Sequence, residues 1–282
     1  MTAETLGCGT DIPCAPASPR LGGRFQLLEQ VSVAGGASAW RATDAVLYRT
    51  VTVHLLASGP VTADLRDAVR AAARLADPRL TRIFDVDYDA ERPYVVSEWA
   101  PGRSLEQLAS AGSADPALAA TIIAEAGEAL AIGHEAGIPH LCLDSHSLRW
   151  GESGVKITGL GLEAALRRPR VDDPASADTR ALARMLYALL TGCWPGTEPT
   201  ALPAAPWHRG GWYSPRQVTA GVPRALNRIT CSALRPENAR APLCTPAHLA
   251  RALRQAGQVP PPVSAVTKNT KGRPSRSSRL MA

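Results

Sequence analysis

The hydrophobic pattern of this chain changes period once, at Ser104, and this change constrains the fold more than any other feature. Residues 24–57 alternate apolar and polar side chains in short runs separated by Gly and Asp, which is typical of antiparallel strands joined by hairpins. From Ser104 onward the apolar residues follow a helical period. This order predicts an α+β fold with two lobes, a small β-rich N-lobe and a larger helical C-lobe.

The N-lobe is expected to span residues 21–101. After the first strands, residues 62–77 show an alanine-rich helical pattern. Residues 80–89 and 92–100 are predicted to form two further strands.

The C-lobe is expected to span residues 102–256. Ser104 and Gln107 have the spacing of a capping box, and Asp115 before Pro116 marks the start of a second helix. Further helices are expected at 176–192 and 245–257, and a short β-hairpin at 147–150 and 155–158.

The two ends of the chain have a different composition. Residues 1–20 and 257–282 are rich in Pro, Ser, Thr and Gly and poor in large apolar residues, so we expect both to be disordered. The stretch from Lys268 to Arg279 is basic and adds to the formal net charge of +6. Such a tail either contacts anionic membrane lipid by non-specific electrostatics or is only solvated, and no specific nucleic-acid binding is expected.

The six cysteines form no Cys-x-x-Cys pair and follow no secretory segment. We therefore expect reduced thiols, no structural metal site and a cytoplasmic protein, with peripheral membrane contact through the tail. No run of about 18 apolar residues occurs, so no transmembrane helix is expected.

Six stretches resemble, in order, the bacterial Ser/Thr protein kinase fold over residues 24–255. They are "GRFQLLEQV", "WRATD", "RPYVVSEWAPGRSLEQL", "IPHLCLDSHSL", "VKITGLG" and "SADTRALARMLYALLTGCWPG". The resemblance implies a bilobal protein kinase-like fold. It also implies that a glycine-rich loop, a Lys–Glu pair and two metal ligands position a nucleotide between the lobes.

At the places where the resemblance implies nucleotide-binding residues, this chain carries other residues. Ser32, Ala34 and Ala37 stand at the three glycine positions of the phosphate loop. His54 stands at the lysine position and Ala68 at the position of the helix glutamate. A neutral imidazole cannot supply a permanent long-reach cation.

The catalytic loop and the metal-binding turn are altered too. Cys142 replaces the base aspartate, Ser147 the metal-binding asparagine, and Gly159 the metal-binding aspartate. One alternative is a shifted register that makes Asp144 the base, although it would misplace His140. Another is a thiol nucleophile at Cys142 activated by His140 or His146.

Several scaffold positions of the resemblance are retained: His140, Leu160, Gly161, Asp178 and Arg240. Sixteen residues separate Gly161 from Asp178, which is expected to cap a helix, and the activation segment is therefore expected to be truncated.

The hinge of the resemblance falls at Glu98, Trp99 and Ala100, after Ser97, and it leaves space for adenine. We expect no cofactor and no metal there. Weak, metal-independent ATP binding stays open as an alternative.

These losses predict a pseudokinase that is not an enzyme and acts as a phospho-regulated scaffold. The pattern resembles the kinase-like module associated with the actinobacterial MviN-type lipid II flippase, which implies an upstream Ser/Thr kinase, an FHA-domain partner and a role in peptidoglycan precursor regulation. Thr267, Thr270 and Ser275 are the candidate phosphosites. The alternative function is an unorthodox Ser/Thr protein kinase or a nucleotide-binding protein.

Overall fold

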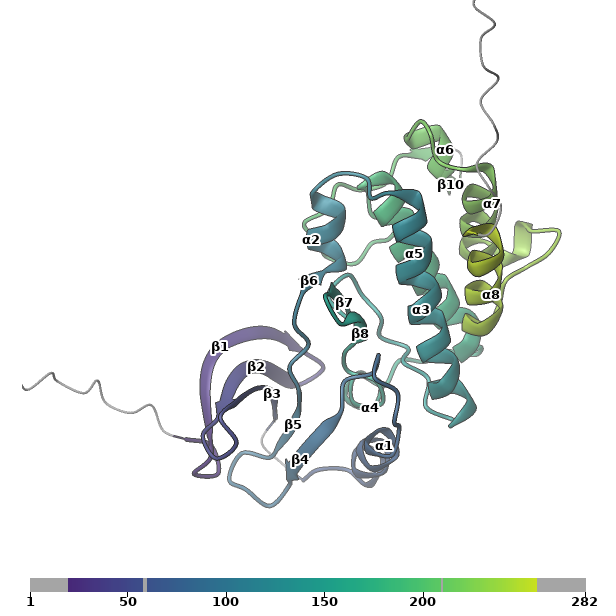
Figure 1. Cartoon of the computed structure of the whole chain (residues 1–282). Coiled ribbons are helices and arrows are strands. Elements are labelled where there is room, and N and C mark those ends of the chain that lie inside the picture. Colours follow the sequence, from purple (N-terminus) through teal and green to yellow (C-terminus); the bar gives the residue numbers. More distant parts are fainter. Residues whose placement is uncertain (1–19, 58–59, 209, 258–282) are drawn as a thin grey trace, which may run out of the picture.

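A computed structural model describes residues 20–57, 60–208 and 210–257, and in it a β-rich lobe is followed by a larger helical lobe (Figure 1). The β-rich lobe contains a five-stranded antiparallel sheet with the strand order β1-β2-β3-β5-β4. Its strands are β1 (Phe25–Ala34), β2 (Ala37–Asp44), β3 (Arg49–Leu56), β4 (Ile83–Asp87) and β5 (Tyr94–Glu98).

The alternating pattern of the first strands puts one set of side chains into the core of this lobe. Phe25, Val51, Val53 and Val96 are at most 1% exposed and pack together on one side of the sheet. The helix α1 (Ala63–Ala73) has Leu65 and Val69 packed in a second cluster that includes Leu56, Val95 and Leu162.

Six helices and one 3₁₀ turn make up most of the helical lobe. They are α2 (Leu105–Ser110), α3 (Pro116–Glu135), α5 (Pro174–Thr191), α6 (Pro215–Val218), α7 (Arg224–Leu234), α8 (Pro246–Gly257) and η1 (Pro236–Asn238). The predicted capping box is present, because the Ser104 hydroxyl accepts from the Gln107 N–H and the Gln107 side chain accepts from the Ser104 N–H. Asp115 caps α3 as predicted.

The helix α3 is the central helix of this lobe. Among the described residues it alone is long and apolar enough to cross a membrane by length and composition, and 56% of its most apolar window is buried inside the protein. Ile122, Ile123 and Leu130 on α3 belong to the same core cluster as Leu182 and Leu186 on α5.

Several further elements were predicted only in part. The hairpin β7 (Leu148–Gly151) and β8 (Gly154–Ile157) was predicted, and β6 (Arg103–Ser104) pairs with β7 to complete a three-stranded sheet. The structure also contains elements that were not predicted, which are α4 (Leu162–Arg167), α6, α7 and the pair β9 (Trp207–His208) and β10 (Gly211–Trp212).

Candidate nucleotide cleft

A cavity of about 240 Å³ lies where the β-sheet meets the helical lobe. Strands β1, β2, β3 and β5 form one wall, and the hinge, residues 144–149, residues 158–159 and the helix α4 (Leu162–Arg167) form the other. The sequence-derived site residues that line it are Ser32, His54, Glu98, Trp99, Ala100, Ser147 and Gly159.

His54, at the lysine position, is buried within the sheet and has no charge to offer a phosphate. It is 7% exposed, and its Nε2 lies 3.1 Å from the Ser97 hydroxyl. Burial lowers the pKa of His54 to about 4, so the imidazole is neutral at physiological pH.

The helix glutamate of the resemblance has no substitute on α1. Ala68 lies on α1 opposite Gly161, the residue that precedes α4. A Cβ added at Gly161 would lie 3.2 Å from the Ala68 carbonyl oxygen. The neighbouring Asp67 is exposed and pairs with Arg70 at 3.4 Å. The described residues therefore contain no Lys–Glu pair at this place.

The phosphate-loop position is a tight hairpin turn. Ser32 and Ala34 lie at the end of β1, Ala37 begins β2, and Gly35 and Gly36 between them have φ of +59° and +78°. A Cβ on Gly35 would lie 2.8 Å from Cγ of Arg167, so the turn packs against the Arg167 side chain.

Arg167 links the two carboxylates that line this end of the cavity. Its Nε donates to Oε2 of Glu163 at 2.9 Å, and its Nη2 lies 4.0 Å from Oδ2 of Asp144. Glu163 in turn approaches Gly159, where a Cβ would lie 2.6 Å from Cγ of Glu163. The Glu163 side chain thus takes the room next to Gly159 that a larger residue would need.

Asp144 also holds its own loop in shape. Its Oδ1 accepts from the backbone N–H groups of His146 and Ser147, both at 2.9 Å, and from the Ser147 hydroxyl at 2.8 Å. Ser147 is therefore engaged by Asp144, and the second Asp144 oxygen faces Arg167.

A magnesium ion, which the kinase fold implies, does not fit this arrangement. Asp144 and Glu163 both face the guanidinium of Arg167, and the described residues contain no group of three His, Cys, Asp or Glu side chains that could hold a metal. The positive charge between the two carboxylates is supplied by Arg167.

Cys142 does not have the properties of an activated thiol. Burial raises the pKa of its thiol to about 11, so the thiol is protonated at physiological pH. A raised pKa does not favour the alternative of a thiol nucleophile at this position, which stays a prediction.

Asp178 anchors the loop that precedes the cleft. Its Oδ2 accepts from the backbone N–H of His140 at 2.8 Å and lies 2.8 Å from His134 Nε2, and its Oδ1 accepts from the Leu141 N–H at 2.7 Å. The expectation that Asp178 caps a helix is wrong, because α5 begins at Pro174 with Asp173 as its cap.

The other retained scaffold residues have different places. His140 is fully buried, and its Nε2 lies 2.8 Å from the Thr158 carbonyl oxygen. Leu160 belongs to the core of the helical lobe, and Gly161, with φ of +77°, precedes α4. Arg240 lies outside the cleft, in a separate pocket of the helical lobe.

An ion pair and an arginine side chain lie at the hinge. Glu98 pairs with Lys156 at 2.5 Å, and Ala100 is buried. The guanidinium of Arg149 lies 5.7 Å from the ring centroid of Trp99, and burial lowers the pKa of Arg149.

The fold and this cleft define a protein kinase-like structure. The solved structure of Rad53 residues 1–466 in complex with AMP-PNP matches it with a TM-score of 0.62 over 84% of this chain and 66% of that one, at 18% identity. No protein-family model matches the chain.

The curated relatives are bacterial Ser/Thr kinases. A probable serine/threonine-protein kinase of Clostridium acetobutylicum is 25% identical over 77% of this chain and 38% of its own length. The serine/threonine-protein kinase PrkC of Bacillus subtilis is 24% identical over 76% and 38%, and PknL of Mycobacterium tuberculosis is 25% identical over 74% and 57%. The chain thus spans well under half the length of the first two relatives.

These comparisons overturn the prediction that the chain is not an enzyme. Its relatives over about three quarters of its length are named as kinases, and its structure matches a kinase. Substitutions at family positions, taken alone, do not establish inactivity. The scaffold, upstream kinase, FHA-domain, peptidoglycan and membrane predictions stay predictions, and Thr267, Thr270 and Ser275 lie outside the described residues.

Glu163 and Arg167 were not predicted as site residues. Their i, i+4 spacing directly after the retained Gly161 is a signal of a short helix with an internal ion pair, and it could have been found. That the Gly35 turn meets this pair is a tertiary contact that no local pattern contains.

Proposed function

We propose that this chain is an unorthodox Ser/Thr protein kinase-like protein that binds a nucleoside triphosphate in the interlobe cleft without requiring a metal. The observation that carries the proposal is the position of Arg167, beneath the Gly35 turn and between Asp144 and Glu163. A cation near the phosphate-loop position can neutralise part of the charge of a triphosphate.

An arginine suits this role better than the residue at the lysine position. The guanidinium is permanently charged and presents five donors in a plane, so it can contact phosphate oxygens while one donor stays on Glu163. His54 is neutral and its Nε2 already lies 3.1 Å from the Ser97 hydroxyl. The cation proposed to contact the phosphates is therefore Arg167 on α4, and not a residue of the sheet.

Asp144 is the acceptor that phosphoryl transfer would use. As the oxygen of a serine or threonine hydroxyl forms its bond to the γ-phosphorus and the nucleoside diphosphate leaves, the hydroxyl proton passes to Oδ2 of Asp144. The capping bonds to Oδ1 keep the carboxylate oriented for that role.

Thermal unfolding with ATP, in EDTA and separately in Mg²⁺, tests nucleotide binding. Binding at one hundred times Kd should stabilise the chain by about 2.7 kcal/mol in both buffers. Arg167→Ala should lose this gain, whereas Arg170→Ala, an exposed arginine that does not line the cleft, should keep it. A gain confined to Mg²⁺ buffer would overturn the metal-free mode, and no gain in either buffer would overturn nucleotide binding.

Transfer is measured separately, with γ-labelled ATP and a mixture of serine- and threonine-containing protein substrates. Label should reach the substrates with the wild-type chain and fall about a hundredfold or more with Asp144→Asn. Equal transfer by the variant would remove Asp144 from the reaction. Nucleotide binding without any transfer would leave a nucleotide-binding protein.

A further inference from the structure

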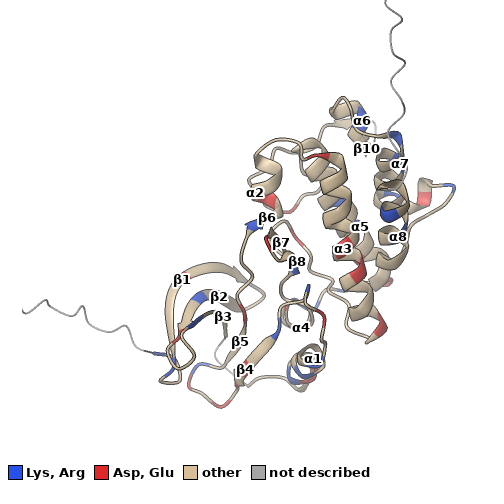
Figure 2. Cartoon of the chain, viewed as in Figure 1, with Lys and Arg blue, Asp and Glu red and all other residues tan. Residues whose placement is uncertain are grey.

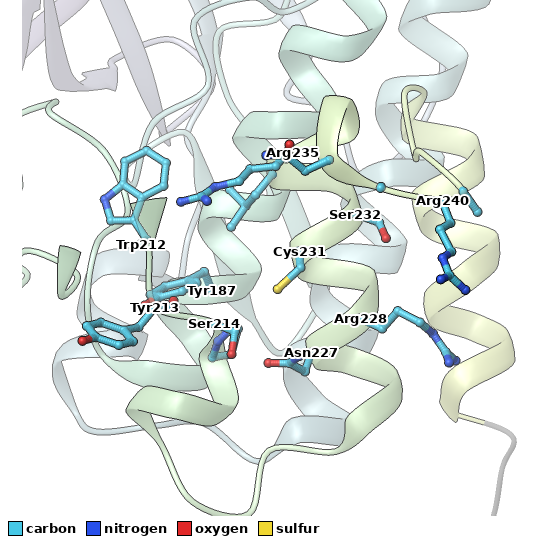
Figure 3. Close-up of a pocket in the computed structure, with 15 residues that line it drawn as sticks. Tyr187, Trp212, Tyr213, Ser214, Asn227, Arg228, Cys231, Ser232, Arg235 and Arg240 are labelled. Atoms are coloured by element: carbon cyan, nitrogen blue, oxygen red, sulfur yellow. Dashed lines mark hydrogen bonds between the residues drawn. The ribbon is translucent and has the colours of Figure 1, made fainter. Parts of the chain in front are cut away.

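A second pocket, larger than the nucleotide cleft, lies within the helical lobe. It has a volume of about 530 Å³ and is formed by α5, β10, α6, α7, η1 and the loop after η1 (Figure 3). Among the described residues, it shares no lining residue with the nucleotide cleft. Its described lining residues come from the chain after residue 186, so the segment between Gly161 and α5 contributes none of them.

The charge of this pocket has one sign. Of the residues that the structure describes, Arg228, Arg235 and Arg240 line it, and no Asp or Glu does. Within the part of the chain that the structure describes, none of the three forms an ion pair, whereas Arg254 on the neighbouring α8 pairs with Glu128 at 2.8 Å. Figure 2 shows basic residues along α7 and α8, and the sequences of both helices contain no acidic residue. The charged side chains among the described lining residues are therefore all positive, and Glu237 on η1 is exposed and does not line the pocket.

Two of these arginines face solvent at the same side of the pocket. Figure 3 shows the side chains of Arg228 and Arg240 together on one side, and both residues are exposed. Two guanidinium groups on one rim can hold a single carboxylate or phosphate with several charge-assisted hydrogen bonds. They lose less side-chain hydration there than in a closed cavity.

The opposite side of the pocket is aromatic. Tyr187, Trp212 and Tyr213 line it, and the Tyr187 hydroxyl donates to the Tyr213 carbonyl oxygen at 2.9 Å. Arg235 lies 5.8 Å from the ring centroid of Trp212. Its guanidinium also packs against Gly211, where any Cβ would collide with it. This side offers a flat, partly apolar surface with one positive charge at its edge.

We propose that this arginine pocket binds an acidic peptide segment of a partner protein. The anionic side chain, a carboxylate or a phosphate, lies between Arg228 and Arg240, and a neighbouring apolar or aromatic side chain lies against Trp212 and Tyr213. A peptide fits better than a compact anion, because the charged rim and the aromatic surface lie on different sides and are bridged by a chain that carries both groups.

Binding is tested on the full chain with three peptide libraries, each randomised around one fixed central residue. The fixed residue is phosphothreonine, glutamate or threonine. Each library is applied to the immobilised protein, the protein is washed, and the amount of retained peptide is measured. The phosphothreonine and glutamate libraries should be retained at least tenfold more than the threonine library, and retained peptides should be enriched in apolar or aromatic residues near the fixed position. The ratio between the two anionic libraries tells which anion the pocket prefers.

The matched variants are Arg228→Gln with Arg240→Gln, and Arg224→Gln as the control. Arg224 is exposed on the same helix one turn earlier and does not line the pocket. The double variant should lose at least tenfold in retention, and the control should equal the wild type. All three residues are exposed, so the melting temperatures should match and a loss cannot be ascribed to unfolding.

Four results would overturn the proposal. They are equal retention of all three libraries, equal loss in the double variant and the control, no retention of any library, and displacement of the bound peptides by inorganic phosphate at the same concentration as by peptide. The last would mean a bare anion site. None of these measurements uses nucleotide, so they stand apart from the test of the cleft.

Discussion

The side chain of Glu163 occupies the space beside Gly159: a Cβ at position 159 would lie only 2.6 Å from Cγ of Glu163. Gly159 has φ of +83°, a conformation that residues with a side chain adopt at a cost. Because Gly159 has no side chain, the Glu163 side chain has room to pack beside it. This packing places the carboxylate on α4, where Arg167 one turn later can pair with it.

A double-mutant cycle at these two positions tests this relationship. Gly159→Ala should lower the free energy of unfolding by about 2 kcal/mol, through the positive φ and the collision with Glu163. In the Glu163→Ala background the same change should cost about 1 kcal/mol, because only the backbone strain remains. Urea unfolding of the four proteins gives the coupling energy, and additive effects would show that the two residues do not compete for space.

The burial of His54 makes the stability of the β-rich lobe depend on pH. The unfolded chain takes up a proton at His54 near pH 6.5, whereas the folded chain takes it up only near pH 4. Lowering the pH through this interval therefore favours the unfolded state, by an amount on the order of 3 kcal/mol, and above pH 6.5 the contribution is constant.

His54→Gln removes this titration and can keep a hydrogen bond to Ser97. Urea unfolding between pH 7.5 and pH 4 should show a clearly smaller loss of stability for the variant than for the wild type. His248→Gln, at an exposed position on α8, is the control and should follow the wild type. Parallel curves for His54→Gln and the wild type would mean that His54 is accessible to protons in the folded state.

Much of the fold could be predicted from the sequence because its signals are local. The alternation in residues 24–57 and the caps at Ser104 and Asp115 are each contained in a few neighbouring residues, and the structure has the corresponding strands and helices. The helix α7 has an equally periodic sequence and was missed, although its apolar residues Leu226, Ile229 and Ala233 are all buried.

The candidate site could be predicted only as a set of missing groups. The substitutions at His54 and Gly159 follow from motif register, but the position of Arg167 depends on the turn at Gly35, which is distant in sequence and meets it only in the folded chain. Likewise, Asp178 was recognised as a scaffold residue, but its bonds to His140 and Leu141 depend on the packing of α5 against that loop.

Removal of the Asp178 carboxylate should destabilise the helical lobe. Asp178→Ala would leave the buried backbone N–H of His140 and the part-buried N–H of Leu141 without their acceptor, at a cost of about 3 kcal/mol. Asp178→Asn keeps one acceptor oxygen and should cost less. Asp172→Ala, at an exposed position just before α5, should change the free energy of unfolding by less than about 0.5 kcal/mol. If Asp178→Ala unfolds at the same urea concentration as Asp172→Ala, the loop does not depend on this anchor.

Arg149 lies at the base end of the nucleotide cleft, and its expected effect there rests on the proposed nucleotide binding. Its guanidinium lines the cavity near Trp99, and burial lowers its pKa, so it stays charged at a cost in hydration. Arg149→Leu replaces this charge with an apolar surface for an adenine ring. Affinity for ATP should rise about tenfold, which corresponds to the burial of one leucine side chain, whereas affinity for inorganic tripolyphosphate should stay unchanged or fall.

Titration calorimetry of both ligands separates the base from the phosphates. Arg103→Leu is the control, because Arg103 is exposed after the hinge and does not line the cavity. A gain for tripolyphosphate equal to that for ATP would place Arg149 near the phosphates instead of the base. Unchanged ATP affinity would show that the base does not contact position 149.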